Sequence, residues 1–186
     1  MYTQNITAIR KEVLIMHQFQ TYPIDLLELN PFTKLAEEWM IITSGNQEKV
    51  NGMTASWGGF GVLWGQNTAF IFVRENRYTK EFIDNGEYFS CSFFDKKFKN
   101  DLKYFGVVSG RVEDKFKTAG LNVNFRDNIP FVDEGNFIVL CKKMAAVPIT
   151  ETHFLNPELK EKWYSGKEEN NFHTMYVGEI VEILAR

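Results

Sequence analysis

The sequence predicts a mainly β protein, an antiparallel barrel that carries peripheral helices. Short apolar or alternating segments are separated by turn residues along most of the 186-residue chain, which is typical of strands. Helical segments interrupt only some of these strands, whereas a doubly wound parallel sheet would alternate strand and helix throughout. No repeat, low-complexity tract or Pro/Gly linker divides the chain, so residues 1–186 are expected to form a single domain. Residues 1–29 show weak periodicity and are expected to be an irregular N-terminal arm with one strand at most.

The first half of the chain is expected to contain three strands and two helices. Asn30 can cap a helix, and Pro31 suits its first position because a helix start leaves that amide unused. Thr79 can cap a second helix, and Gly86 can end it. In chain order, the expected elements are a helix over 31–39, a strand over 40–43, a turn at 44–47, strands over 50–57 and 68–73, and a helix over 80–85.

The second half is expected to alternate strands with short helices. Asp95 and Asp114 are capping candidates, and Gly120 can end the helix that Asp114 begins. In chain order, the expected elements are a strand over 88–94, helices over 95–104 and 114–119, strands over 131–132 and 137–146, a helix over 157–163 and a strand over 176–184.

Composition argues against two classes of partner. Hydrophobic residues make up 44% of the chain and charged residues 24%, which is ordinary for a globular protein. The formal net charge is −3, whereas a general nucleic-acid binder usually has an excess of basic residues. No stretch reaches the roughly 18 apolar residues of a membrane span, and no signal peptide is visible. We therefore expect neither a nucleic acid nor a membrane as partner.

Cysteines and histidines are too sparse to build a disulfide framework or a metal centre. Cys91 and Cys141 lie far apart in sequence and form no CxxC pair, which favours a reducing, cytoplasmic location. The three histidines, His17, His153 and His173, show no spacing typical of metal ligands. We expect a cytoplasmic protein without a metal.

Residues 51–57 (Asn-Gly-Met-Thr-Ala-Ser-Trp) combine hydroxyls, backbone amides and small side chains. In a strand, the hydroxyls of Thr54 and Ser56 project to one face, opposite Trp57. Two interpretations fit this pattern. The strand could bind a flat ligand through its amides and hydroxyls, or it could be a half-buried strand of alternating polarity.

A second pattern delivers two arginines to a helix start. The expected strand 68–73 leads into Arg74, and Arg77 lies just before the next helix. Free helix amides, the positive end of the helix dipole and arginine donors together favour a phosphate. The alternative is a pair of solvated arginines that contact Glu75 or Glu81. Beside the small-residue strand, this pattern predicts a ligand with a flat apolar ring and a phosphate tail.

Five motifs in one order point to a known family. They are residues 51–57, Arg77-Tyr78-Thr79, residues 89–94 (Phe-Ser-Cys-Ser-Phe-Phe), Ser109-Gly110-Arg111 with Asp114-Lys115, and residues 173–180 (His-Thr-Met-Tyr-Val-Gly-Glu-Ile). Over about residues 30–184, they resemble the flavin reductase-like, FMN-binding split-barrel family, close to its flavoredoxin branch. The resemblance implies a split β-barrel of Greek-key type with flanking helices, a homodimer, noncovalent FMN and electron transfer from a nicotinamide donor.

The resemblance also implies site residues. Arg77 is the first candidate for the phosphate because it belongs to a motif, and Arg74 is the second. Lys115 could reach the phosphate or remain exposed, and Cys91 is either a border of the ring or a small buried hydrophobe. His173 is assigned to the nicotinamide side of the ring, with a structural role as the alternative. The expected FMN-binding residues are Asn51, Met53, Thr54, Ala55, Ser56, Trp57, Arg74, Arg77, Tyr78, Thr79, Ser90, Cys91, Ser92 and Lys115.

Two main functions and a third, weaker one remain open at this point. As an enzyme, the protein would pass a hydride from NAD(P)H to FMN and electrons onward to a small molecule or a protein. As a flavoredoxin-type carrier, it would exchange electrons with a protein partner and react slowly with NAD(P)H; a ferric or small-molecule reductase is a third reading. Residues 59–64 begin like a dinucleotide fingerprint but end in Trp64 instead of glycine, so any nicotinamide would bind on the open face of the flavin.

Overall fold

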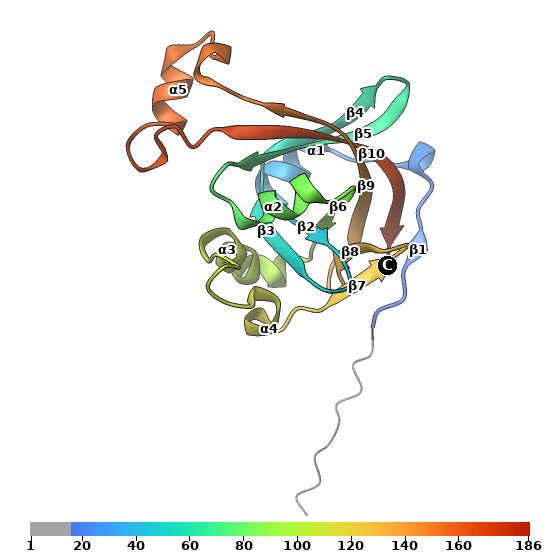
Figure 1. Cartoon of the computed structure of the whole chain (residues 1–186). Helices are drawn as coiled ribbons and strands as arrows, with labels where there is room; N and C mark the ends of the chain where they lie inside the picture. Colours follow the sequence, from blue (N-terminus) through green and yellow to red (C-terminus); the bar gives the residue numbers. More distant parts are fainter. Residues whose placement is uncertain (1–15) are drawn as a thin grey trace, which may run out of the picture.

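A curved antiparallel sheet of eight strands forms the body of the computed structural model, which describes residues 16–186 (Figure 1). Seven strands follow the order β3-β2-β6-β9-β10-β5-β4, and β1 pairs with β10. Within the described residues, the end strands β3 and β4 do not pair with each other, so the barrel is split. The strands are β1 (Gln20–Thr21), β2 (Met40–Gly45), β3 (Val50–Ala55), β4 (Gly58–Leu63), β5 (Gln66–Arg74), β6 (Tyr88–Phe93), β9 (Phe137–Pro148) and β10 (His173–Ala185). The predicted fold class is confirmed; positions 1–15 of the expected arm lie outside the described residues.

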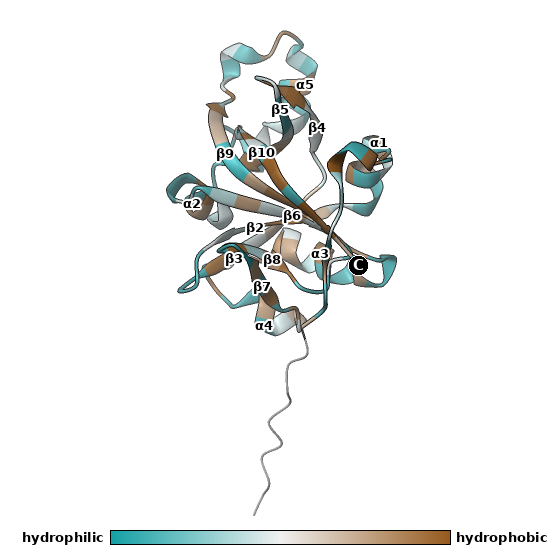
Figure 2. Cartoon of the chain, turned by 90° about the vertical axis from the view of Figure 1, so that its right-hand side faces the viewer, coloured by the Kyte–Doolittle hydropathy of each residue, from teal (hydrophilic) through white to brown (hydrophobic). Residues whose placement is uncertain are grey.

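Alternate residues of the strands build the barrel core. In β6, Phe89 and Phe93 are fully buried in the central apolar cluster. Ser90 and Ser92 point to the other face, as the two-residue period of a strand requires. There the Ser90 hydroxyl donates to the Pro130 carbonyl at 2.6 Å, and the Ser92 hydroxyl accepts a backbone amide of the neighbouring hairpin. Figure 2 shows hydrophobic stretches along the long strands β9 and β10, which contribute to the same core.

A separate hairpin, β7 (Val123–Arg126) and β8 (Ile129–Val132), closes one end of the molecule. Its two-residue turn has positive φ at both Asp127 (47°) and Asn128 (67°). Such a turn matches the twist of the flanking strands and is favoured by Asp and Asn. The sequence analysis predicted part of β8 and missed β7.

Short helices surround the sheet. The predicted cap at Asn30 is present, since its side-chain oxygen accepts the amides of Phe32 (3.1 Å) and Thr33 (3.4 Å). The helices are α1 (Pro31–Thr33), continued by a π turn (Lys34–Glu38), α2 (Tyr78–Asn85), α3 (Lys99–Val107), α4 (Lys115–Ala119) and α5 (Pro157–Trp163), with 3₁₀ turns at Ile24–Leu26, Lys96–Phe98, Glu151–His153 and Gly166–Glu168. Helices α2 and α3 pack on β2 and β3. Every helix in residues 16–186 is too short or too polar to traverse a membrane.

Of the three other predicted N-caps, two are wrong and one is confirmed. Helix α2 begins at Tyr78, and the Thr79 hydroxyl accepts a hydrogen bond from Asn51 instead of capping the helix. Asp95 makes no capping bond either, because its carboxylate accepts the Asn136 amide. Asp114 does cap α4, through the amide of its third residue, and the left-handed Gly120 (φ 67°) ends that helix as predicted.

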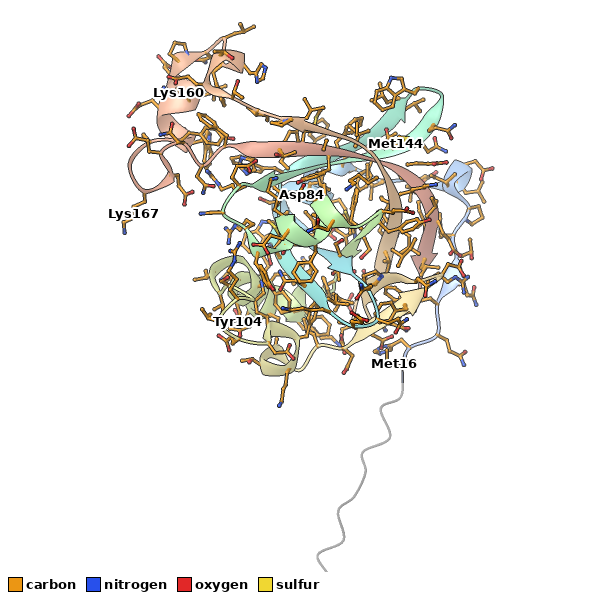
Figure 3. All side chains as sticks on the ribbon, viewed as in Figure 1. Met16, Asp84, Tyr104, Met144, Lys160 and Lys167 are labelled. Atoms are coloured by element: carbon orange, nitrogen blue, oxygen red, sulfur yellow. The ribbon has the colours of Figure 1, made fainter. Side chains whose placement is uncertain are left out.

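The chain leaves the barrel between β9 and β10. Residues 149–172, which include α5, stand out from the sheet at the upper left of Figure 1. Lys160 and Lys167 lie on this projecting segment in Figure 3, far from the barrel axis. The segment returns to the barrel at His173, which is paired with Arg74 of β5.

Candidate functional site

Two adjoining cavities contain most of the expected site residues. The first, the α2 cavity, has a volume of about 220 Å³ and lies at the N-terminus of α2. The second, the Trp57 cavity, has a volume of about 300 Å³ and lies beside the β3–β4 loop. Met53 and Arg77 line both cavities, so the two are contiguous. Together they fall within the size range of small-molecule sites, about 300–1,000 Å³.

Lys115 supplies a buried cation to the α2 cavity. It is the first residue of α4, and only 4% of its surface is exposed. Its ammonium group donates to the Phe105 carbonyl at 3.1 Å. Burial, together with the nearby Arg77, lowers the pKa of Lys115 to about 8. An ammonium group held in this way favours an anionic ligand, because such a ligand would compensate the lost hydration.

Arg77 supplies a second cation at the junction of the two cavities. It occupies the N-cap position of α2, and its guanidinium donates to the Gly106 carbonyl at 2.8 Å. Burial is the main cause that lowers the pKa of Arg77; Glu168 opposes this shift and Arg74 adds to it. Within residues 16–186, neither Arg77 nor Lys115 forms a salt bridge with a carboxylate.

Two close contacts of Asn51 fix the wall of the α2 cavity. Asn51, which is 6% exposed, donates its side-chain amide to the Thr79 hydroxyl at 2.8 Å. Gly110 lies against Asn51, since a Cβ at Gly110 would approach the Asn51 Oδ1 to 2.1 Å. The first amides of α2, at Tyr78 and Thr79, belong to the donors that a helix start leaves without intrahelical partners. The cavity therefore combines helix amides, the positive end of the α2 dipole and two cations, which fits a phosphate.

The Trp57 cavity is aromatic. The Trp57 ring meets the Trp163 ring edge to face at a centroid distance of 4.8 Å, and it lies 5.0 Å from the His173 ring. The His173 Nδ1 is 2.7 Å from the Tyr164 hydroxyl, and this hydrogen bond fixes the orientation of the imidazole. Burial and the charges of Arg74 and Arg77 lower the pKa of His173 to about 4, so the imidazole is neutral at pH 7. Flat aromatic ligands fit such a wall.

Arg74 contributes to the Trp57 cavity but not to the α2 cavity. Its guanidinium donates to the carbonyl groups of Asn171 (2.9 Å) and Trp163 (3.1 Å). It also contacts the Glu168 carboxylate at 3.3 Å and lies 5.0 Å from the centre of the Tyr164 ring. All of these partners belong to the projecting segment 149–172.

The structure brings eleven of the fourteen expected FMN-binding residues to the two cavities. The α2 cavity contains Asn51, Met53, Arg77, Tyr78, Thr79 and Lys115. The Trp57 cavity contains Met53, Thr54, Ala55, Ser56, Trp57, Arg74 and Arg77, and also His173. The Thr54 hydroxyl is already engaged, because it donates to the Leu102 carbonyl.

Ser90, Cys91 and Ser92 line neither cavity, which departs from the expectation. Both serine hydroxyls bond to β8, and both residues are fully buried. Cys91 lies in the barrel core, where burial raises the pKa of its thiol to about 12. A thiol of this kind is unreactive, so Cys91 packs as a small hydrophobe.

Sequence reasoning missed several cavity residues. Trp163 comes from the projecting segment, and no pattern in the sequence links it to Trp57. The segment 107–110 lines the α2 cavity, and its Ser109-Gly110 pair lies inside one of the recognised motifs. That motif was therefore the signal that could have placed this segment at the site.

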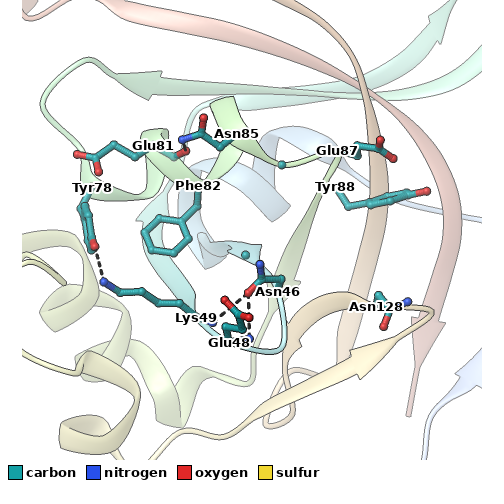
Figure 4. Close-up of a pocket in the computed structure, with 12 residues that line it drawn as sticks. Asn46, Glu48, Lys49, Tyr78, Glu81, Phe82, Asn85, Glu87, Tyr88 and Asn128 are labelled. Carbon is teal, nitrogen blue, oxygen red and sulfur yellow. Dashed lines mark hydrogen bonds between the residues drawn. The ribbon is translucent and has the colours of Figure 1, made fainter.

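A larger cavity lies on the other side of Tyr78, with a volume of about 470 Å³ (Figure 4). In this cavity Lys49 donates to the Tyr78 hydroxyl at 2.7 Å, and the lining also includes Glu48, Glu81 and other polar residues. Its size alone gives it no priority as the functional site. It mixes both charge signs, whereas the charged side chains that line the α2 cavity, Arg77 and Lys115, are both cations.

Comparison with known families decides the identity of the fold. Residues 32–186 match the family described as Flavin reductase like domain. The chain belongs to this family. No curated protein matches the chain.

Solved structures of this family share the fold at low sequence identity. Flavoredoxin from Methanosarcina acetivorans is 19% identical with a TM-score of 0.61, over 80% of this chain and 68% of that one. Flavoredoxin of Desulfovibrio vulgaris (Miyazaki F) is 20% identical with a TM-score of 0.61, over 80% and 69%. An FMN-binding domain of a flavin reductases-like enzyme from Shewanella baltica OS155 is 14% identical with a TM-score of 0.63, over 92% and 78%.

Proposed function

We propose that the protein binds FMN noncovalently, one per subunit, and works as an NAD(P)H-dependent oxidoreductase. The observation that carries this proposal is the pair of cations at the N-terminus of α2, the buried Lys115 and the partly buried Arg77. They line a cavity that adjoins an aromatic one. This arrangement suits a ligand with a phosphate at one end and a flat ring at the other, as in FMN.

Each group of residues has a separate task in this proposal. Arg77, Lys115 and the first amides of α2 hold the phosphate. The backbone of residues 54–56 and the hydroxyl of Ser56 meet the polar edge of the ring system, and Trp57 limits access of water. When bound, FMN supplies a ring that accepts a hydride and releases electrons to a small-molecule or protein acceptor.

His173 is proposed to position the nicotinamide of the donor. It lies in the Trp57 cavity, and its orientation is fixed by Tyr164. With its pKa lowered to about 4, the imidazole offers the donor a neutral, flat surface near pH 7. Binding and orientation are therefore its tasks, and no proton transfer is assigned to it.

The Arg77→Ala variant tests the phosphate assignment. We expect FMN binding to weaken by about 1.5–3 kcal/mol, the range for a hydrogen bond to a charged group, while riboflavin affinity stays nearly unchanged. Quenching of flavin fluorescence during titration measures both affinities. Arg126→Ala is the matched control, because Arg126 pairs with Glu182 on the surface, outside both cavities. Equal losses of FMN and riboflavin affinity would show that Arg77 supports the fold through Gly106 instead.

Anaerobic stopped-flow mixing separates the enzyme from the electron carrier. The enzyme requires fast bleaching of bound FMN absorbance by NADH or NADPH. Slow bleaching by both donors, together with rapid reduction by dithionite, would identify a carrier that serves a protein partner. A purified protein that neither absorbs as a flavin nor quenches added FMN would contradict the whole proposal.

We also propose that the protein is a homodimer. An apolar groove of about 670 Å³ runs between α1 and β4 and adjoins the Trp57 cavity, with which it shares Ser56, Trp57 and Phe72. Phe32 lies in this groove and is 82% exposed. Large exposed apolar side chains gathered in one groove are typical of an interface.

A further inference from the structure

The projecting segment 149–172 packs mainly on itself. Its aromatic side chains form their own cluster, in which the Phe154 and Phe172 rings lie 5.2 and 5.0 Å from the Tyr164 ring. The segment leaves the barrel at the end of β9 and returns at the start of β10 (Figure 1). The contacts that join it to the barrel lie at this base, which includes Trp163 at the end of α5. The position of the segment over the Trp57 cavity must therefore be set by contacts at that base.

Arg74 makes several of these contacts from a single side chain, beside the Trp57–Trp163 ring contact and the bond from the Asn76 amide to Asn171. Its guanidinium reaches two carbonyls that are eight residues apart in the segment, at Trp163 and Asn171, and also the Glu168 carboxylate. The planar fork of an arginine can donate to several acceptors at once, which a lysine cannot reproduce. The Arg74 side chain is only 14% exposed, and its bond to the Asn171 carbonyl is partly buried, whereas the Trp163 carbonyl and the Glu168 carboxylate meet it at the surface.

The bonds to Arg74 fix the residues that complete the Trp57 cavity. Trp163, whose carbonyl is held by Arg74, places its indole edge-on against Trp57. Tyr164, whose ring lies under the Arg74 guanidinium, holds His173 through its hydroxyl. One arginine on β5 thus sets the outer wall of a cavity whose inner wall belongs to the barrel.

We propose that Arg74 is a positioning residue that pins segment 149–172, and that the pinned segment is the wall that selects a flat aromatic ring in the Trp57 cavity. This inference deepens the proposed function and rests on it. It also reassigns Arg74, because the guanidinium acts on the ring end of the site and not on the phosphate.

Lysine-specific proteolysis of the flavin-free protein tests the pin. Lys160, Lys162 and Lys167 lie within the segment, and Figure 3 shows Lys160 and Lys167 on its projecting part. We expect Arg74→Gln to accelerate cleavage at these sites about tenfold, the effect of losing roughly one strong hydrogen bond. Cleavage at Lys97, an exposed site elsewhere, should not change.

Two variants make this result interpretable. Arg74→Lys keeps the charge but loses the fork, so its cleavage rate should lie between wild type and Arg74→Gln. Arg126→Gln removes a surface arginine at the far hairpin and should cleave like the wild type. Unchanged cleavage in Arg74→Gln, or an equal acceleration at Lys97, would overturn the pin.

Flavin binding tests the wall. Arg74→Gln should weaken FMN and riboflavin by the same factor, about three- to tenfold, because the two ligands share the ring and differ only in the phosphate. A loss confined to FMN would make Arg74 a phosphate ligand, and unchanged affinity for both would show that the wall does not hold the ring; either result overturns the proposal. If the wild type binds no flavin, the proposed function fails, while the protease result still decides whether Arg74 pins the segment.

Discussion

At the scale of single residues, Lys115 shows how the site is prepared for a ligand. Lys115 is almost completely buried, and within residues 16–186 the one hydrogen-bond acceptor of its ammonium group is the Phe105 carbonyl. A buried cation without a counter-charge disfavours the folded state, and an anionic ligand removes that cost. Arg77, only partly buried, carries the same kind of cost at the other side of the cavity.

The free-energy cost of burying the charged Lys115 ammonium group depends on pH, because its pKa is shifted. Its pKa in the folded protein, about 8, lies below the ordinary value of 10.5. Between these values the unfolded chain binds more protons, so the stability of the flavin-free protein should rise as the pH increases from about 8 to 10.5. Below pH 8 the cost is fully present. Lys115→Met should therefore stabilise the flavin-free protein at pH 7 by about 1–3 kcal/mol, measured by urea unfolding.

Binding of a phosphate should reverse this shift. At pH 9 Lys115 is mostly neutral in the free protein, and a bound anion would restore its proton. We expect FMN binding at pH 9 to take up close to one proton, which calorimetry in buffers of different ionisation enthalpy detects. Riboflavin, which lacks the phosphate, should take up far less, and Lys115→Met should abolish the difference. Equal uptake for both flavins would place the phosphate away from Lys115.

At the scale of elements, local signals predicted what local chemistry controls. The Asn30 cap, the Asp114 cap and the left-handed Gly120 all appear where the sequence placed them. The predicted cap at Thr79 is wrong, because the Thr79 hydroxyl accepts a hydrogen bond from the buried Asn51 side chain instead of a helix amide. A cap preference is a local effect, and a tertiary contact can override it.

The elements that could not be predicted depend on distant partners. β4 is rich in glycine, a poor strand former, and forms because it pairs with β5 along its whole length. At Gly58 a side chain would collide with the Phe70 carbonyl, 2.5 Å from its Cβ, so the pairing requires glycine there. The Trp163 contribution to the site was equally invisible, because it depends on where segment 149–172 folds back.

The contact between the 107–110 segment and β3 offers a test at this scale. A Cβ at Gly110 would lie 2.1 Å from the Asn51 Oδ1, and Asn51 cannot move without losing its bond to Thr79. We expect Gly110→Ala to lower the free energy of unfolding by about 1–3 kcal/mol, as overpacking does. It should also weaken FMN binding, because Asn51 and Thr79 line the α2 cavity.

Gly106→Ala is the matched control. Gly106 lies inside α3, and a Cβ there meets Thr54 at an ordinary 3.6 Å. Alanine favours a helix interior over glycine by up to about 1 kcal/mol, so this variant should be as stable as the wild type or more so. Urea unfolding of the two variants compares them directly. Equal destabilisation of both would mean that the loss in Gly110→Ala does not come from the close approach to Asn51.

At the scale of the whole molecule, the apolar groove between α1 and β4 is the proposed interface of the homodimer. It lies next to the Trp57 cavity, so a partner subunit seated in it would cover the open side of the ring site. Exclusion of water from that side would strengthen every polar contact to a bound ring. Assembly and flavin binding are therefore expected to support each other.

Phe32→Glu should separate the subunits. Phe32 is 82% exposed in the groove, and a carboxylate buried there without a partner would oppose association. We expect light scattering at micromolar concentration to give twice the 21.7 kDa chain mass for the wild type and the single-chain mass for Phe32→Glu. Leu155→Glu is the control, because Leu155 is 98% exposed on the projecting segment, outside the groove, and should leave the mass unchanged. Because the groove shares Trp57 with the ring site, the separated variant should bind FMN and riboflavin equally more weakly, whereas a loss confined to FMN would show that the substitution had disturbed the α2 cavity instead.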